Sequence, residues 1–543
     1  MAGQITQPII VIDPSKEHVH GNDAVQMNIT AAIAVANTVK STFGPSGMDK
    51  MLVDVAGDVT ITNDGETILR KIAVEHPSAK TIVAVASTQE KEAGDGTTAS
   101  VMFAGELLNK AGTLVGLGIH PTTIITGYLM AERRSHEILN DITTEISPDD
   151  SDLLRGIAAT AMVGKAIACD NLAPLCVQAV QMIKNGTVDV FNDIRIQKSV
   201  GKKIEDLELI TGVVIDKRRV HDGMPKIVED AHIALLTSGI QYRKFGTMPG
   251  GKSKDKVKIQ SVDELQGFYD GEEAAIRSDI DVLVNIGVNA VFCTQSITES
   301  SQSYLVKRGI LGVARVNEND LEAISHATGA NILSNIVDVE ESDLGFAGRV
   351  EETGAEDEEL IYITECTNPK AVSLVVHGGT EHVVDVIEGA LNDALRVVAD
   401  VAEDGTTVAG GGACEIELAL HLKEYAATVG GKEQLAINAY ADALETLPYA
   451  LAHNAGLDAT DMLTALRSSH IAGGATSGID VYNGEIVDMY EHGVVEPFRV
   501  KNQMLKSATD ATTMIIRVDD VLASERKELT PSPGQAPHDY DRF

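Results

Sequence analysis

The sequence predicts a multi-domain chain with α and α/β parts: a mainly helical domain built from both termini, with further domains inserted between them. At a typical size of ~150 residues per domain, the length of 543 residues suggests about three or four domains. Hydrophobic residues make up 44% of the chain, which is enough for sizeable cores. Helical patterns at both ends and strand-like runs in the middle give the order of the parts.

The N-terminal part has helical patterns broken by one predicted hairpin. Strand-like Met51–Val55 and Val59–Thr62 flank a Gly57-Asp58 turn, as in an antiparallel pair. The Gly44-Pro45 pair ends the first helix, because neither residue continues helical geometry well. The helical patterns cover residues 24–43, 68–136 and 150–185.

Near residue 187 the pattern changes to short strand-like runs separated by helical or turn segments, which is typical of an α/β domain. Strand-like Val372–Val376 and a helical stretch over residues 380–402 follow, and helical patterns dominate from residue 413. The strand-like runs of the middle part are Val188–Phe191, Val213–Ile215, Ile233–Leu236, Val282–Ile286, Val291–Phe292 and Val313–Arg315.

The charge excludes several classes of partner. With 80 acidic and 44 basic side chains the formal charge is −36, which argues against nucleic acid and against anionic lipid, since both carry negative charge. No apolar run approaches the ~18 residues of a spanning helix, and no signal peptide is visible, so we expect a cytoplasmic protein. The five cysteines include no Cys-x-x-Cys pair, so a zinc site and a disulfide framework are both poorly supported.

The segment Gly94–Thr98 (GDGTT) directly precedes an apolar helical run and is a candidate phosphate-binding loop. Glycines let a backbone approach a ligand closely, and a helix N-terminus offers unpaired N–H groups to an anion. In such a loop Asp95 makes sense as a Mg²⁺ ligand, since a bare carboxylate would repel phosphate. The alternative is an ordinary Asp-Gly turn with a threonine N-cap, which the local pattern alone favours.

Three other segments could carry chemistry, and each has a purely structural alternative. Asp64 lies in the corner Thr62–Gly65 after a strand, where it could orient a water or simply form a turn. Asp393 lies inside a predicted helix, where an aspartate is more often solvated than catalytic. The glycines of Ala409–Ala413 indicate close backbone packing against another helix or a ligand.

Residues 246–253 fit the P-loop spacing G-x-x-x-x-G-K-S. That motif binds phosphate only between a buried strand and a helix whose N-terminus faces the phosphates. Here polar residues precede it and the alternating segment Lys254–Gln260 follows. We therefore interpret it as a flexible loop with a solvated basic patch.

Several separated motifs agree in order and spacing with one known family. They are Gly44–Leu52 (GPSGMDKML), Thr62–Gly65, Gly94–Thr98, Ala409–Gly412, Gly484–Pro497 and Arg517–Asp520. On these motifs the chain resembles the group II chaperonins, the family of the archaeal thermosome and its kin, the eukaryotic cytosolic chaperonin. The resemblance covers nearly the whole chain except the C-terminal tail.

The resemblance implies three domains and an ATP-driven activity. A mainly helical equatorial ATPase domain would comprise residues 1–149 and 407–543. A small intermediate hinge domain would comprise residues 150–216 and 370–406, and an α/β apical domain with a lid protrusion residues 217–369. ATP with Mg²⁺ would be hydrolysed to close a double-ring chamber around a non-native protein, with identical or homologous subunits in stacked rings as partners.

The resemblance also implies roles for individual residues. Asp95 matches the Mg²⁺ ligand, and Asp64 and Asp393 match the carboxylates that position and activate the attacking water. Phosphoryl transfer needs these parts: positioning, a metal that takes up charge, and an oriented water. The residues that match nucleotide contacts are Gly44, Gly96, Thr97, Thr98, Lys165, Gly411, Glu496 and Lys501.

Departures from the family pattern keep a second hypothesis open. Ser46, Asn22 and Gln26 stand where the family has basic residues that serve contacts between subunits. The chain could therefore be a chaperonin-like structural or regulatory subunit with weak ATPase activity that needs other subunits. The intact set of aspartates favours the folding chamber.

Overall fold

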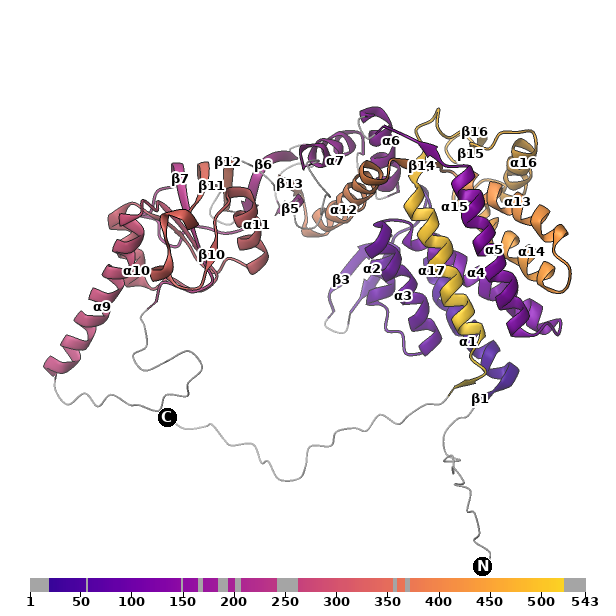
Figure 1. Ribbon diagram of the computed structural model, residues 1–543, viewed down its shortest axis with the longest axis horizontal. Coiled ribbons are helices and arrows are strands. Elements are labelled where there is room, and N and C mark those ends of the chain that lie inside the picture. Colours follow the sequence, from indigo (N-terminus) through magenta and orange to yellow (C-terminus); the bar gives the residue numbers. More distant parts are fainter. Residues whose placement is uncertain are drawn as a thin grey trace, which may run out of the picture.

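The computed structural model has three bodies in a row, which we call the helical body, the middle body and the sheet body (Figure 1). The helical body and the sheet body lie at opposite ends, and α12 of the middle body runs beside the helical body. The structure describes residues 19–54, 57–147, 150–164, 169–183, 194–200, 207–241, 262–354, 359–366 and 372–521.

The helical body is built around the helix α4 (Thr97–Gly116). Its side chains are apolar on nearly every side, so the helix is stable only when others enclose it. Helices α1, α3, α14 and α17 pack against it. The ring of its buried Phe103 packs edge to face on the ring of Tyr440, with the two ring centroids 5.2 Å apart. One core thus joins helices from both ends of the chain. The other helices of this body are α1 (Gly21–Val39), η1 (Lys40–Thr42), α2 (Gly65–Lys71), α3 (Pro77–Ala93), α5 (Pro121–Asp141), α13 (Ala413–Thr428), α14 (Glu433–Leu444), α15 (Thr446–Asn454), α16 (Ala459–Ile471) and α17 (Phe498–Ile516).

Short strands tie the ends of the helical body together. The predicted hairpin is confirmed: β2 (Lys50–Val53) pairs antiparallel with β3 (Val59–Thr62). Strand β14 (Thr406–Ala409) lies between β4 (Thr144–Glu145) and β17 (Val495–Pro497), so the chain that leaves this body is hydrogen-bonded to the chain that returns to it. The remaining pairs are β1 (Val19–His20) with β18 (Asp520–Val521) and β15 (Ser477–Asp480) with β16 (Glu485–Asp488).

The middle body consists of helices packed on two parallel strands. Its core contains residues from both the outgoing and the returning chain. The long helix α12 begins after Thr380, whose hydroxyl accepts from the Val383 N–H, and ends at Gly405, whose φ of +64° suits glycine. The elements are α6 (Ser151–Met162), α7 (Cys169–Ile183), β5 (Ile194–Val200), β13 (Val372–Gly378) and α12 (Glu381–Asp404).

The sheet body continues the same sheet, in the order β5-β13-β6-β12-β11-β7-β8-β9, with β10 beside β7. The strand predicted over Val282–Ile286 is wrong, because this segment is the end of α9 and the turn after it. A short apolar run cannot be told from a buried helix segment by its pattern, and here Ile276, Ile280 and Leu283 are buried at helical spacing. The elements are β6 (Glu208–Ile215), β7 (Ile227–Leu236), α9 (Val262–Asn285), β8 (Ala290–Cys293), α10 (Glu299–Arg308), β9 (Leu311–Val313), α11 (Glu318–Thr328), β10 (Ile332–Leu333), η3 (Ile336–Asp338), η4 (Glu341–Asp343), β11 (Gly345–Thr353) and β12 (Leu360–Cys366).

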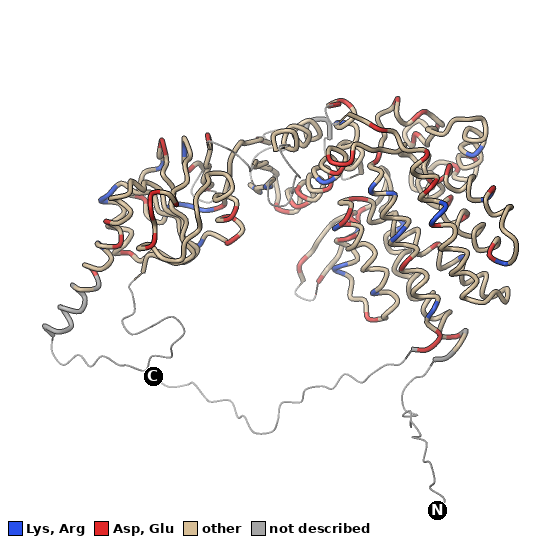
Figure 2. The backbone as a smooth tube through the Cα atoms, viewed as in Figure 1, with Lys and Arg blue, Asp and Glu red and all other residues tan. Residues whose placement is uncertain are grey.

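Acidic side chains are distributed over all three bodies (Figure 2). Within the part of the chain that the structure describes, no helix has both the length and the apolar character needed to cross a membrane. Three predicted features lie outside the described residues: the P-loop-like segment 246–253, the run Val188–Phe191 and the candidate nucleotide contact Lys165.

Ion pairs attach the C-terminal turns of α12 to the start of α17. The Arg499 guanidinium donates to Asp400 at 2.7 Å, to Glu403 at 3.1 Å and to Asp404 at 2.6 Å and 2.8 Å. Burial raises the pKa of Asp400 to about 7; Arg499 opposes this rise, and Asp404 and Glu403 add to it.

We expect Asp400→Asn to flatten part of the pH dependence of stability. Between about pH 4 and pH 7 the folded chain holds a proton on Asp400 that the unfolded chain has lost. The contribution of Asp400 to the free energy of unfolding therefore falls as the pH rises through that window. Asparagine cannot ionise, so the Tm of the variant relative to wild type should rise across the window. Thermal unfolding at fixed salt checks this, and parallel Tm curves would contradict it.

Candidate functional site

A cavity of about 430 Å³ lies where the helical body meets α6 and α12. Its wall is assembled from segments far apart in the sequence, which the strand pairs around β14 bring together. Lys165 lies outside the described residues, and all the other predicted site residues line the cavity: Gly44, Asp64, Asp95, Gly96, Thr97, Thr98, Asp393, Gly411, Glu496 and Lys501.

The candidate phosphate loop opens the helix α4. The N-cap residue is Gly96, with a φ of +77° and no side chain to cap the first N–H groups, and Thr97 is the first helical residue. The alternative of a threonine N-cap is therefore wrong. The buried Gln89 side chain connects the loop to α17: its Nε2 donates to the carbonyl of Asp95 at 2.9 Å and to that of Val500 at 3.1 Å. The uncapped helix start faces the cavity, which suits an anion.

Asp64 is held directly beside this loop. It is the N-cap of α2, and its Oδ2 accepts from the Thr67 N–H at 2.8 Å. The next residue, Gly65, touches the loop so closely that an added Cβ would lie 2.6 Å from Thr98 Oγ1 and 3.1 Å from Thr97 Oγ1. The Asp64 carboxylate and the two threonine hydroxyls thus belong to one packed unit.

Asp393 enters the cavity from α12, on the side of the middle body. A further carboxyl group lies near these aspartates: Glu90 of α3, which the sequence did not indicate. Burial raises the pKa of Glu90, and the negative charges of Asp393, Asp64 and Asp95 raise it further, while Arg396 lowers it. Asp393, Asp64 and Asp95 therefore lie near enough to Glu90 for their negative charges to act on it.

At another part of the wall a buried lysine bridges two carboxylates. Lys501 Nζ lies 2.6 Å from Glu415 Oε1 and 2.7 Å from Glu496 Oε2. Burial alone would lower the pKa of Lys501, but Glu415 and Glu496 outweigh it and raise that pKa. Glu415, which also lines the cavity, was not indicated by the sequence. The lysine holds both carboxylates in place. Burial raises the pKa of Glu496, and the charge of Lys501 opposes that rise.

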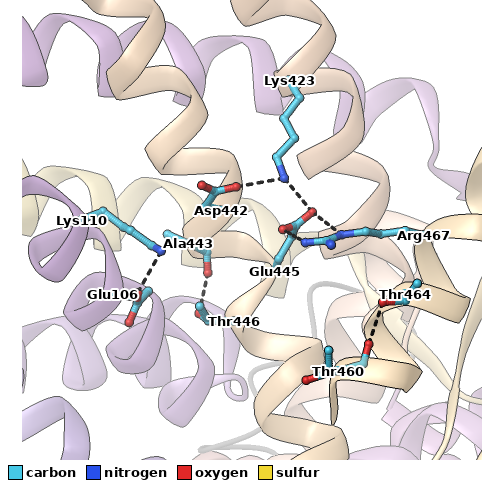
Figure 3. Close-up of polar contacts among 10 residues, drawn as sticks. All are labelled: Glu106, Lys110, Lys423, Asp442, Ala443, Glu445, Thr446, Thr460, Thr464 and Arg467. Carbon is cyan, nitrogen blue, oxygen red and sulfur yellow. Dashed lines mark hydrogen bonds and ion pairs between the residues drawn. The ribbon is translucent and has the colours of Figure 1, made fainter. Parts of the chain in front are cut away.

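The helix α15 forms an apolar part of the wall through Pro448 and Leu451. The predicted close packing of the glycine run is confirmed: an added Cβ on Gly412 would lie 2.6 Å from Pro448 Cβ. A polar cluster at the start of α15 holds it in position (Figure 3). There the buried Glu445 carboxylate lies between Lys423 Nζ, at 2.9 Å, and the Arg467 guanidinium, whose Nε donates at 3.0 Å.

The residues present fit a nucleotide with a divalent cation. Among the described residues, no group of three or more His, Cys, Asp or Glu side chains could hold a metal ion. In nucleotide sites, however, Mg²⁺ takes one or two carboxylates together with phosphate oxygens. The helix start supplies donors for phosphate, and a cation beside Asp95 would offset the negative potential that acts on Glu90.

The chain belongs to the TCP-1/cpn60 chaperonin family, whose model matches residues 35–526. It is 48% identical over 534 residues to the thermosome subunit of Pyrococcus horikoshii, covering 97% of this chain and 96% of that one. It is 48% identical to the thermosome subunit beta of Archaeoglobus fulgidus over 97% of both chains, and 49% identical to the thermosome subunit of Methanopyrus kandleri over 96% of both. The resemblance to the group II chaperonins is thus confirmed over nearly the whole chain.

Proposed function

We propose that this chain is an ATP-hydrolysing subunit of a group II protein-folding chaperonin, with its nucleotide site in the cavity at the start of α4. The observation that carries the proposal is convergence. One cavity is lined by an uncapped helix start, by the aspartates Asp64, Asp95 and Asp393, and by a buried lysine paired with carboxylates. These groups come from both ends of the chain. A protein of the TCP-1/cpn60 family uses ATP, and this cavity has the donors and carboxylates for it.

In this proposal the three bodies correspond to the three domains of the family, except that β6, described above with the sheet body, belongs to the intermediate domain. The equatorial ATPase domain comprises residues 1–149 and 407–543, the intermediate hinge domain residues 150–216 and 370–406, and the apical domain with the lid residues 217–369. Separate apolar cores in the helical, middle and sheet bodies support this division. The partners are non-native proteins and like subunits in stacked rings, and the excess of acidic side chains disfavours nucleic acid and anionic membranes.

Asp95 is the proposed Mg²⁺ ligand, and the Mg²⁺ ion, when bound with ATP, supplies positive charge that stabilises the developing charge on the phosphates. The residues of this chain do the rest. The first N–H groups of α4 and the hydroxyls of Thr97 and Thr98 hold phosphate oxygens. Asp64, fixed by its cap to α2, and Asp393, carried by α12, orient a water from two sides. Because they sit on different bodies, movement of α12 would control when the water is aligned.

We expect Asp393→Ala to lower the rate of ATP hydrolysis by about 100-fold or more, because orienting and activating the water is worth about 10²–10⁴-fold in rate. Binding of ATP should stay within about threefold of wild type, since Asp393 acts on the water and not on the phosphates. Steady-state hydrolysis and nucleotide titration in high salt with Mg²⁺ check both values.

The matched control for Asp393→Ala is Glu388→Gln, which removes a carboxylate, 31% exposed, from the same helix outside the cavity. This variant should hydrolyse ATP like wild type. If Asp393→Ala retains normal hydrolysis, the proposed role of Asp393 is wrong. If wild type itself does not hydrolyse ATP, the result favours the alternative of a structural or regulatory subunit that needs other subunits.

The hairpin β2–β3 supports assembly with other subunits. One of its faces is apolar and exposed, with Met51 opposite Ile61 and Val53 opposite Val59. Exposure of an apolar hairpin face to water is unfavourable, and such a face tends to associate with another chain. We therefore propose that this hairpin contacts the neighbouring subunit in the ring.

The double substitution Met51→Glu and Ile61→Lys should prevent ring formation while leaving the subunit folded, since both side chains are exposed in the single chain. Light scattering after size-exclusion chromatography would show a species of subunit mass, with the circular dichroism of wild type. Rings of unchanged stability would place the interface elsewhere. A wild-type chain that never forms rings alone would instead favour the partner-dependent subunit.

A further inference from the structure

The helix α12 contacts the end of α3 through one arginine. Arg396 Nη1 donates to the Glu90 backbone carbonyl at 2.9 Å and also to the Glu90 carboxylate. The side chains are 15% and 22% exposed, so water weakens this contact less than it weakens one on the surface. Neither residue is among those that line the cavity.

The same contact lies directly before the candidate phosphate loop. The Glu90 carbonyl also accepts from the N–H of Gly94, the left-handed residue that ends α3. An added Cβ on Gly94 would lie 2.5 Å from Arg396 Cβ, so the arginine lies against a backbone that only glycine leaves open. A cation at the last carbonyls of α3 is favourable, because that end of a helix carries partial negative charge.

Asp393 and Arg396 are three residues apart on α12, so they lie on the same side of the helix, about one turn apart. On the α3 side of the contact, Asp95 directly follows Gly94, the residue at the end of α3. We propose that Glu90 and Arg396 form a positioning pair that sets Asp393 of α12 against the loop carrying Asp95. This inference rests on the proposed function of Asp393 and adds residues that touch neither nucleotide nor water.

Charge explains why both members of the pair are needed. Asp393, Asp64 and Asp95 all act on Glu90, so α12 brings an acidic group toward a region that is already negative. Arg396 compensates this repulsion at the point where the two elements touch. Without it, α12 would retreat from α3 and carry Asp393 away from the water. Without the Glu90 side chain, the arginine would lose its carboxyl acceptor and retain only the backbone carbonyl.

The test is a double-mutant cycle on the assembled protein with Arg396→Ala, Glu90→Ala and both together. For Arg396→Ala we expect kcat for ATP hydrolysis to fall about 10–100-fold while KM for ATP stays within about threefold, since misplacement of a reacting group by about 1 Å costs up to 10²-fold. The double variant should be no slower than the slower single variant, because both substitutions break the same contact. Arg396→Lys should recover part of the rate, since its ammonium can reach one of the two acceptors.

The matched control is Lys198→Ala, which removes a cation that pairs with Asp385 and Glu388 on the same helix at 2.8 Å each, away from the cavity. It should leave kcat unchanged. Hydrogen exchange provides a readout without hydrolysis, because Arg396→Ala should speed exchange in α12 around Asp393 and at the end of α3.

Two results would overturn the inference: unchanged kcat and exchange in Arg396→Ala, or additive losses in the double variant. If wild type hydrolyses ATP and Asp393→Ala does not, either result refutes the positioning pair alone. If wild type does not hydrolyse ATP, the proposed function is refuted, and unchanged exchange in Arg396→Ala would refute the contact independently.

Discussion

The enclosure of α4 is the constraint on which the rest of the structure depends. This helix is apolar on nearly every side, and helices from both ends of the chain are needed to cover it. The chain between those ends must therefore leave the helical body and return to it. The exit and the return are hydrogen-bonded side by side as β4 and β14, and β17 completes that sheet. The topology that buries α4 thus also brings the returning helix α12 to the N-terminus of α4.

The chemistry follows from where the polar groups fall in that arrangement. A helix buried along its length still has unpaired N–H groups at its first turn, and here the N-cap is a glycine that cannot satisfy them. The cavity is also lined by carboxylates: Asp64 at the start of α2, Asp95 in the loop and Asp393 on α12. It therefore combines donors for phosphate with acidic side chains. Each part alone is an ordinary structural feature. Together they favour a phosphorylated ligand that brings its own cation, which is the central claim of the proposed function.

The sequence predicted the parts of this site that lie at visible breaks in the chain. Asp64 and Asp95 stand next to glycines where the chain changes direction, so their positions carried a local signal. Asp393 carried only a weak signal, because an aspartate inside a helix is more often solvated than catalytic, and its role came from the resemblance to a family. Lys165 was predicted on that resemblance and lies outside the described residues, so its role stays a prediction.

The supporting residues could not be predicted, for a physical reason. Glu90 and Arg396 are 306 positions apart, and Glu415 lies 86 positions from Lys501, which only the family resemblance had indicated. Glu90, Arg396 and Glu415 therefore each look like one charge on a solvated helix face until the fold pairs them. The error at Val282–Ile286 has a similar origin, because burial of a helix end depends on tertiary packing that the local pattern does not contain.

A structure of the assembled protein with ADP, aluminium fluoride and Mg²⁺ would test the central claim most directly. The account predicts the fluoride complex at the first turn of α4, the Mg²⁺ ion on Asp95, and Asp64 and Asp393 on the side where the attacking water lies. A nucleotide bound outside this cavity, or a metal ion held without Asp95, would contradict it.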